Sequence, residues 1–140
     1  MIRKKRGQIS VEYLIVVSFV TFIVLTILGI SLFYSTQIQD SIKFNQLERF
    51  AKKIISSAES TFYSGEPSRT TINSYLPEGV TRIEVIENNL VFHVDSAGGT
   101  SIIAYSSKVP IEINGAISTS SGLKKILIVA EDNKVKISGI

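Results

Sequence analysis

A polar junction near the N-terminus is the part of the sequence whose residue types and spacing could support chemistry. Its residues are the basic run Arg3, Lys4, Lys5 and Arg6, then Gly7 and Gln8, then Ser10 and Glu12. Cleavage after Gly7 would remove the basic run and keep the hydrophobic segment, whereas a conventional signal peptide has its cleavage site beyond that segment. Glu12 is the last charged residue before the uncharged residues 13–39. Since a carboxylate buried among apolar helices is costly unless it is paired, Glu12 is expected to need a positive partner.

The rest of the sequence offers little for catalysis or cofactor binding. It has no cysteine, His93 is its single histidine, and no phosphate-binding or nucleophile-elbow motif occurs. The acidic residues between positions 66 and 95 show no paired spacing typical of a hydrolase. Outside the basic run, 11 basic and 12 acidic side chains nearly cancel, so the pI of about 9.2 reflects residues 1–7. We therefore predict no enzyme, no catalytic residue, no metal, no cofactor and no nucleic-acid partner.

One long helix is predicted to carry the junction. Residues 13–39 would span about 40 Å as a helix, more than the ~30 Å hydrocarbon core of a bilayer. Beyond them, apolar residues recur at helical spacing with charges between them, at Ile38, Ile42, Leu47, Phe50, Ile54, Ile55, Ala58 and Phe62. We predict a continuous helix from about Ile9 to Tyr63, ended by Gly65 and Pro67. Its apolar half is residues 8–36 and its amphipathic half residues 37–63.

The pattern of the remaining residues, 64–140, predicts a small β domain. Six short strands are expected at residues 82–87, 90–95, 101–107, 109–113, 125–130 and 134–138. Hairpin turns are expected at Asn88-Asn89 and at residues 131–133. His93 is expected on a strand, at the surface or half-buried. The fold class is therefore α+β, with the amphipathic half of the helix covering a small antiparallel sheet or sandwich.

The order of features at the junction resembles the precursors of type IV pilins. In particular, Gln8-x-Ser10-x-Glu12 directly after Gly7 is similar to the class III signal peptide of euryarchaeal pilins. The resemblance covers residues 3–35, and beyond them only the layout of helix followed by β domain agrees. It implies a type IV pilin-like fold and cleavage between Gly7 and Gln8 by a prepilin peptidase, with Gln8, Ser10 and Glu12 serving recognition and assembly. Glu12 would then neutralise the new N-terminus of a neighbouring subunit.

The same resemblance implies a function. The chain would be a structural subunit of an archaeal type IV-like adhesive pilus, a helical polymer of identical copies. Its partners would be the prepilin peptidase, a secretion ATPase and a membrane platform protein. The basic leader favours the cytoplasmic side, so the precursor would span the membrane once with residues 64–140 outside, before joining an extracellular filament. Two alternatives stay open: a minor subunit that primes or caps filaments, and an uncleaved single-pass membrane protein with a ligand-binding outer domain.

Overall fold

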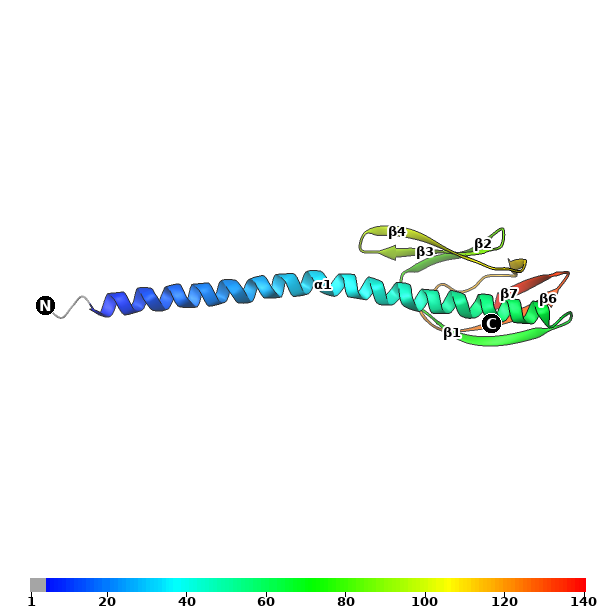
Figure 1. Ribbon diagram of the computed structural model, residues 1–140, viewed down its shortest axis with the longest axis horizontal. Coiled ribbons are helices and arrows are strands. Elements are labelled where there is room, and N and C mark those ends of the chain that lie inside the picture. Colours follow the sequence, from blue (N-terminus) through cyan, green and yellow to red (C-terminus); the bar gives the residue numbers. More distant parts are fainter. Residues whose placement is uncertain (1–4) are drawn as a thin grey trace. The chain divides into compact units, whose positions relative to one another are not determined.

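The computed structural model describes residues 5–140, with side chains from residue 10 onward. Its chain divides into two compact units, one ending at Gln39 and the other formed by Asp40–Ile140. Helix α1 (Lys5–Tyr63) runs through this boundary without interruption (Figure 1). The α+β class and the long N-terminal helix predicted from the sequence are therefore confirmed, and the helix includes Lys5, Arg6 and Gly7 as well.

Helix α1 ends where the sequence provides a stop signal. The N–H of Gly65 donates to the carbonyl oxygen of Phe62 at 3.1 Å, and the N–H of Ser64 donates to that of Ser60 at 3.1 Å. Gly65 has a φ of 82°, the left-handed conformation that commonly closes a helix and that glycine adopts without strain. Tyr63 is thus the last helical residue, as predicted.

Seven strands in the second unit form two sheets. The four-stranded sheet has the order β1 (Arg69–Leu76), β6 (Gly122–Glu131), β7 (Lys134–Gly139), β5 (Ile111–Ile113). The three-stranded sheet has the order β2 (Val80–Ile86), β3 (Asn89–Ser96), β4 (Gly99–Ser106). All neighbouring strands are antiparallel except β5 and β7, which run parallel. The prediction of a purely antiparallel arrangement was therefore wrong at β5.

Two further differences from the prediction are local. Strand β1 was not predicted, because its alternation places a polar residue, Ser74, at a buried position between Ile72 and Leu76. The first hairpin turns one residue earlier than expected, at Glu87-Asn88, and Glu87 takes a φ of 57°. The second turns at Asp132-Asn133, where both φ angles are near 57°, as a two-residue type I′ turn requires.

The hydrophobic core lies between the amphipathic part of α1 and the two sheets. From α1 it contains five fully buried side chains, at Leu47, Phe50, Ala51, Ile54 and Ala58. Both sheets contribute, for example through Phe92 of β3 and Ile128 of β6. The helix therefore serves as a third layer of the second unit, which covers the sheets as the sequence predicted.

Candidate functional site

The N-terminal junction lies within the first turns of α1. The backbone of Gly7, Gln8, Ser10 and Glu12 is helical, and the side chains of Ser10 and Glu12 are exposed. Gln8 and Glu12 are four residues apart, so they share one side of the helix. Arg3 and Lys4 lie outside the described residues, and for Lys5, Arg6, Gly7 and Gln8 the structure describes the backbone alone.

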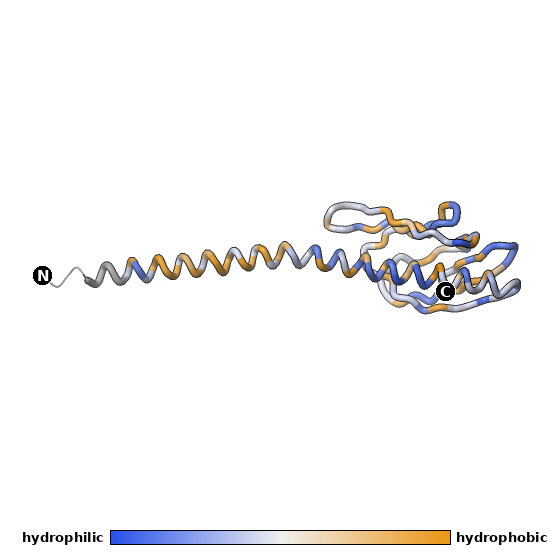
Figure 2. The backbone as a smooth tube through the Cα atoms, viewed as in Figure 1, coloured by the Kyte–Doolittle hydropathy of each residue, from blue (hydrophilic) through white to orange (hydrophobic). Residues whose placement is uncertain are grey.

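The apolar surface that follows Glu12 surrounds the helix. Every large hydrophobic side chain in residues 11–34 is exposed, from 40% at Ile23 to 73% at Leu32. Figure 2 shows the hydropathy of the same segment, with mostly hydrophobic colour along the first half of α1. Of the described residues, this segment alone is long and apolar enough to cross a membrane by length and composition. A membrane anchor and a signal sequence near the N-terminus both meet that criterion, so the segment is a candidate for either.

The threonine hydroxyl groups within this apolar surface are satisfied by the helix itself. Thr21 Oγ1 donates to the carbonyl oxygen of Val17 and Thr26 Oγ1 to that of Phe22, both at 2.8 Å. Thr36 Oγ1 donates to the carbonyl oxygen of Phe33 at 2.9 Å. These are all the threonines of the charge-free stretch. Because none of the three needs water as a partner, all three can enter an apolar environment at low cost.

The packed face of α1 is shorter than the sequence predicted. Ile38 and Ile42 continue the helical period, but they are 58% and 50% exposed. The buried series begins only at Leu47, with Phe44 partly buried ahead of it. Periodicity shows on which side of a helix a residue lies, but not whether another element packs there. Ile38 and Ile42 therefore extend the exposed apolar surface beyond Tyr34.

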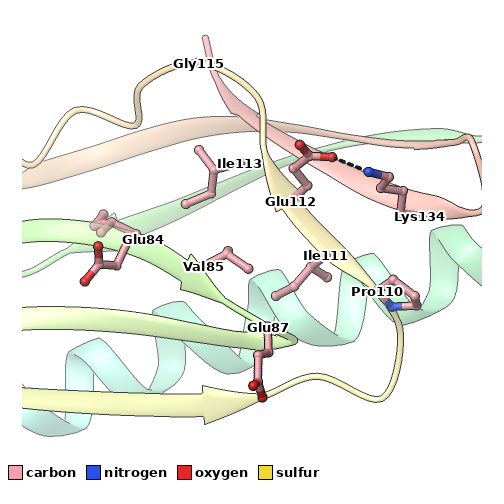
Figure 3. A pocket seen from close by; sticks show the side chains of 10 residues that line it. Glu84, Val85, Glu87, Pro110, Ile111, Glu112, Ile113, Gly115 and Lys134 are labelled. Carbon is pink, nitrogen blue, oxygen red and sulfur yellow. Dashed lines mark hydrogen bonds and ion pairs between the residues drawn. The ribbon is translucent and has the colours of Figure 1, made fainter.

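The sequence did not predict a hollow that lies between β2 and β5. It has a volume of about 570 Å³ and an apolar floor that includes Val85, Ile111 and Ile113. Figure 3 shows three glutamates around it, Glu84, Glu87 and Glu112, at separate places and not converging on one point. The hollow arises because two strands distant in sequence lie near each other, which no local pattern signals.

Two of these glutamates already have partners. Lys134 Nζ donates to Glu112 Oε2 at 3.0 Å, as the dashed line in Figure 3 marks. Glu84 Oε1 is 2.7 Å from His93 Nε2. His93 lies on β3 and its side chain is half-buried, in agreement with the prediction of a strand residue at the surface or half-buried. Among the described residues, no group of three His, Asp or Glu side chains could hold a metal ion. The hollow therefore presents paired carboxylates beside an apolar floor.

Comparison with known proteins adds no identity. No protein family, curated protein or solved structure matches the chain.

Proposed function

We propose that this chain is a structural subunit of an archaeal type IV-like pilus, cut between Gly7 and Gln8 and polymerised through the apolar half of α1. The observation that carries the proposal is the exposed apolar surface around α1, which directly follows the Gly7-Gln8-x-Ser10-x-Glu12 junction. Burying a leucine, isoleucine or phenylalanine side chain stabilises by about 1.5–3 kcal/mol. Summed over residues 11–34, the incentive to leave water is on the order of tens of kcal/mol. The segment needs lipid or protein around it.

The exposed apolar surface of α1 is longer than a membrane-spanning helix needs. Its length favours a surrounding of lipid in the precursor and of protein in the assembled filament. A membrane-spanning helix uses about 20 residues. Exposed apolar side chains extend from Val11 to Ile42, which at 1.5 Å per residue is about 47 Å along the helix. Ile38 and Ile42 would lie near or beyond the edge of the ~30 Å hydrocarbon layer. Neighbouring helices of identical copies would cover them, together with the rest of the surface.

Cleavage supplies the change that moves the helix from lipid to filament. The four basic residues, Arg3 to Arg6, hold the precursor at the cytoplasmic face and oppose its withdrawal into an apolar core. Their removal leaves a new amino group at Gln8, one helical turn from Glu12. In the filament, Glu12 of one copy pairs with the amino group of its neighbour, which fixes the axial register. The β unit, residues 64–140, is then displayed outside, where adhesion takes place.

The test is the N-terminus of the protein in sheared surface filaments. Mass spectrometry should identify this chain with a peptide that begins at Gln8. The implied partners, a prepilin peptidase, a secretion ATPase and a membrane platform protein, are tested by deleting each of them. Loss of the peptidase should leave the full precursor in the membrane. A chain that stays intact in the membrane of wild-type cells would contradict the proposal and favour a single-pass membrane protein. A cleaved chain present only in trace amounts in filaments would indicate a minor subunit that primes or caps them.

A pair of glycine variants tests the cleavage position. Gly7→Phe should accumulate as uncut precursor, because the peptidase would have to accept a bulky side chain at the bond it cuts. Gly29→Phe is the matched control, since a side chain built at Gly29 meets nothing within 4 Å and lies far from the junction. Immunoblots of membranes should show the shorter product for wild type and Gly29→Phe only. Normal cleavage of Gly7→Phe would contradict the proposed cleavage between Gly7 and Gln8.

A further inference from the structure

Strand β4 leaves one edge of the three-stranded sheet open. It is the last strand in the order β2-β3-β4, and among the residues that the structure describes it pairs with β3 alone (Figure 1). Just past the strand end, the N–H of Ser107 donates to the carbonyl oxygen of Asn88 at 2.8 Å. Antiparallel ladders alternate between residues bonded to the partner and residues facing away. The free N–H and C=O groups therefore belong to Thr100, Ile102, Ala104 and Ser106, whose side chains are all exposed.

Each of the other three sheet edges carries a feature that blocks pairing. At β1, Lys53 Nζ of the helix donates to the carbonyl oxygen of Asn73 at 2.6 Å. The N–H of Ala130 donates to the carbonyl oxygen of Ser68, so by the same alternation Asn73 faces away from β6. Lys53 thus occupies an edge carbonyl of β1.

The edges at β5 and β2 are blocked by other means. Strand β5 has three residues and follows Pro110. Strand β2 has an irregular register between Val80 and Arg82, and it carries two charges, Arg82 and Glu84. Short length, proline, bulges and edge charges all disfavour the addition of a further strand.

Strand β4 has none of these protections. It is eight residues long and regular in its pairing with β3. The chain contains no charged residue and no proline in residues 96–107. Ile102, at the middle of the strand, is 67% exposed. An uncharged, regular edge with an exposed aliphatic residue is the kind that pairs with another strand.

We propose that β4 is a docking edge for the β4 strand of a second copy of this chain, in an antiparallel pair about Ile102. In this register Ile102 faces Ile102 of the other copy and Thr100 faces its Ala104, so an aliphatic pair lies at the centre and no charged side chain of β4 faces another. A charged edge would meet its own like charges across a twofold axis, and β4 avoids this repulsion. The uncharged edge of β4 can therefore pair with the same edge of a second copy without electrostatic repulsion.

What the pairing of β4 would do in the cell rests on the proposed function, in which the chain forms filaments. A twofold contact closes on itself, so it cannot propagate a helical filament and instead joins copies in neighbouring filaments. One pair of eight-residue strands is a small contact and should dissociate readily. Repeated along two filaments, the same contact becomes lasting because each further pair forms at high effective concentration. The edge of β4 would thus bundle filaments sideways.

Disulfide trapping tests the pairing, since the chain has no cysteine of its own. Ile102→Cys is expressed as the full chain in cells, and filaments and membranes are treated with a mild oxidant. Leu123→Cys is the matched control, because Leu123 is similarly exposed, at 72%, but lies on β6 of the other sheet, where it pairs with Tyr75 of β1. Because a disulfide requires Cα atoms within about 7 Å, we expect about tenfold more covalent dimer from Ile102→Cys than from Leu123→Cys.

A second change separates strand pairing from random collision. Ala104→Pro removes an outward-facing N–H and leaves the hydrogen bonds to β3 in place, since proline is tolerated at such an edge position. Added to Ile102→Cys, it should reduce the dimer to the level of Leu123→Cys. If Ile102→Cys fails to fold, a mixture of Thr100→Cys and Ala104→Cys chains tests the same register.

The outcomes are distinct from those of the proposed function. Filaments seen by electron microscopy without excess dimer would overturn the pairing of β4 and leave the pilin proposal intact. A disulfide from position 102 to a different protein, in place of the dimer, would overturn it as well. If no filaments form but membrane-embedded chains give the dimer in detergent, the pairing stands and the filament proposal fails.

Discussion

The contact between Phe50 of α1 and Phe92 of β3 should determine how firmly the helix holds the three-stranded sheet. Both side chains are fully buried, with ring centroids 6.0 Å apart and planes at 77°, an edge-to-face pair. Phe92 makes a second edge-to-face contact with Tyr105 of β4. Replacing a buried phenylalanine by alanine costs about 3–5 kcal/mol, of which the aromatic geometry contributes about 0.5–1.5 kcal/mol. We expect Phe50→Ala to lower the free energy of unfolding of the second unit by this amount.

The assay is urea unfolding of the full chain in detergent, followed by circular dichroism and tyrosine fluorescence. Leu123→Ala is the control, because that side chain is largely exposed, and it should change the free energy of unfolding by less than about 0.5 kcal/mol. A double-mutant cycle with Phe50→Leu and Phe92→Leu isolates the pair and should give a coupling of about 0.5–1.5 kcal/mol. Additive single variants, together with a cost below about 1 kcal/mol for Phe50→Ala, would refute the view that α1 is an integral layer of this unit.

Three further predictions concern separate parts of the chain. Glu12→Gln chains that are cleaved should still give few filaments, since losing one partner of a buried charge pair costs about 3–5 kcal/mol; filament yield at the wild-type level would exclude the pairing role. Gly79→Ala should destabilise by at least about 1 kcal/mol more than Gly122→Ala in thermal unfolding. Both glycines have positive φ, but a Cβ at Gly79 would lie 2.8 Å from the backbone oxygen of Asp95, whereas one at Gly122 meets nothing within 4 Å; equal losses would contradict this. Burial, aided by the Glu48 carboxylate, raises the pKa of Tyr105 above its usual 10.0. The folded state then holds the phenol proton more tightly than the unfolded state, so stability falls as the pH rises above about 10, and Tyr105→Phe should show a smaller fall in alkaline urea titrations.

The long helix could be predicted because its signals are local. Residues 8–63 hold no proline and a single internal glycine, Gly29, and the apolar spacing changes from continuous to periodic near Asp40. Gly65 follows at the point where the helix ends. The junction of Gly7, Gln8, Ser10 and Glu12 is likewise defined by sequence spacing alone, and its cleavage stays a prediction.

The arrangement of strands could not be predicted to the same extent, because it depends on contacts distant in sequence. Strand β1 has Ser74 at an inward position and so lacks a clear alternation. The parallel pairing of β5 with β7 reflects the route of the chain between sheets. The free edge of β4 and the hollow beside β5 follow from that route, so they became visible only in the folded chain.

The absence of charge in residues 13–39 has a consequence for the conditions under which such an assembly persists. These residues include no carboxylate, amine, guanidinium or imidazole, and their threonine hydroxyls are bonded within the helix. Contacts made by this stretch should therefore be indifferent to acidity and should strengthen with salts that favour apolar burial. Exposed ion pairs of the second unit, such as Lys134 with Glu112, weaken as ionic strength rises. High salt and acid would thus weaken ion pairs of the second unit, whereas contacts made by residues 13–39 would persist.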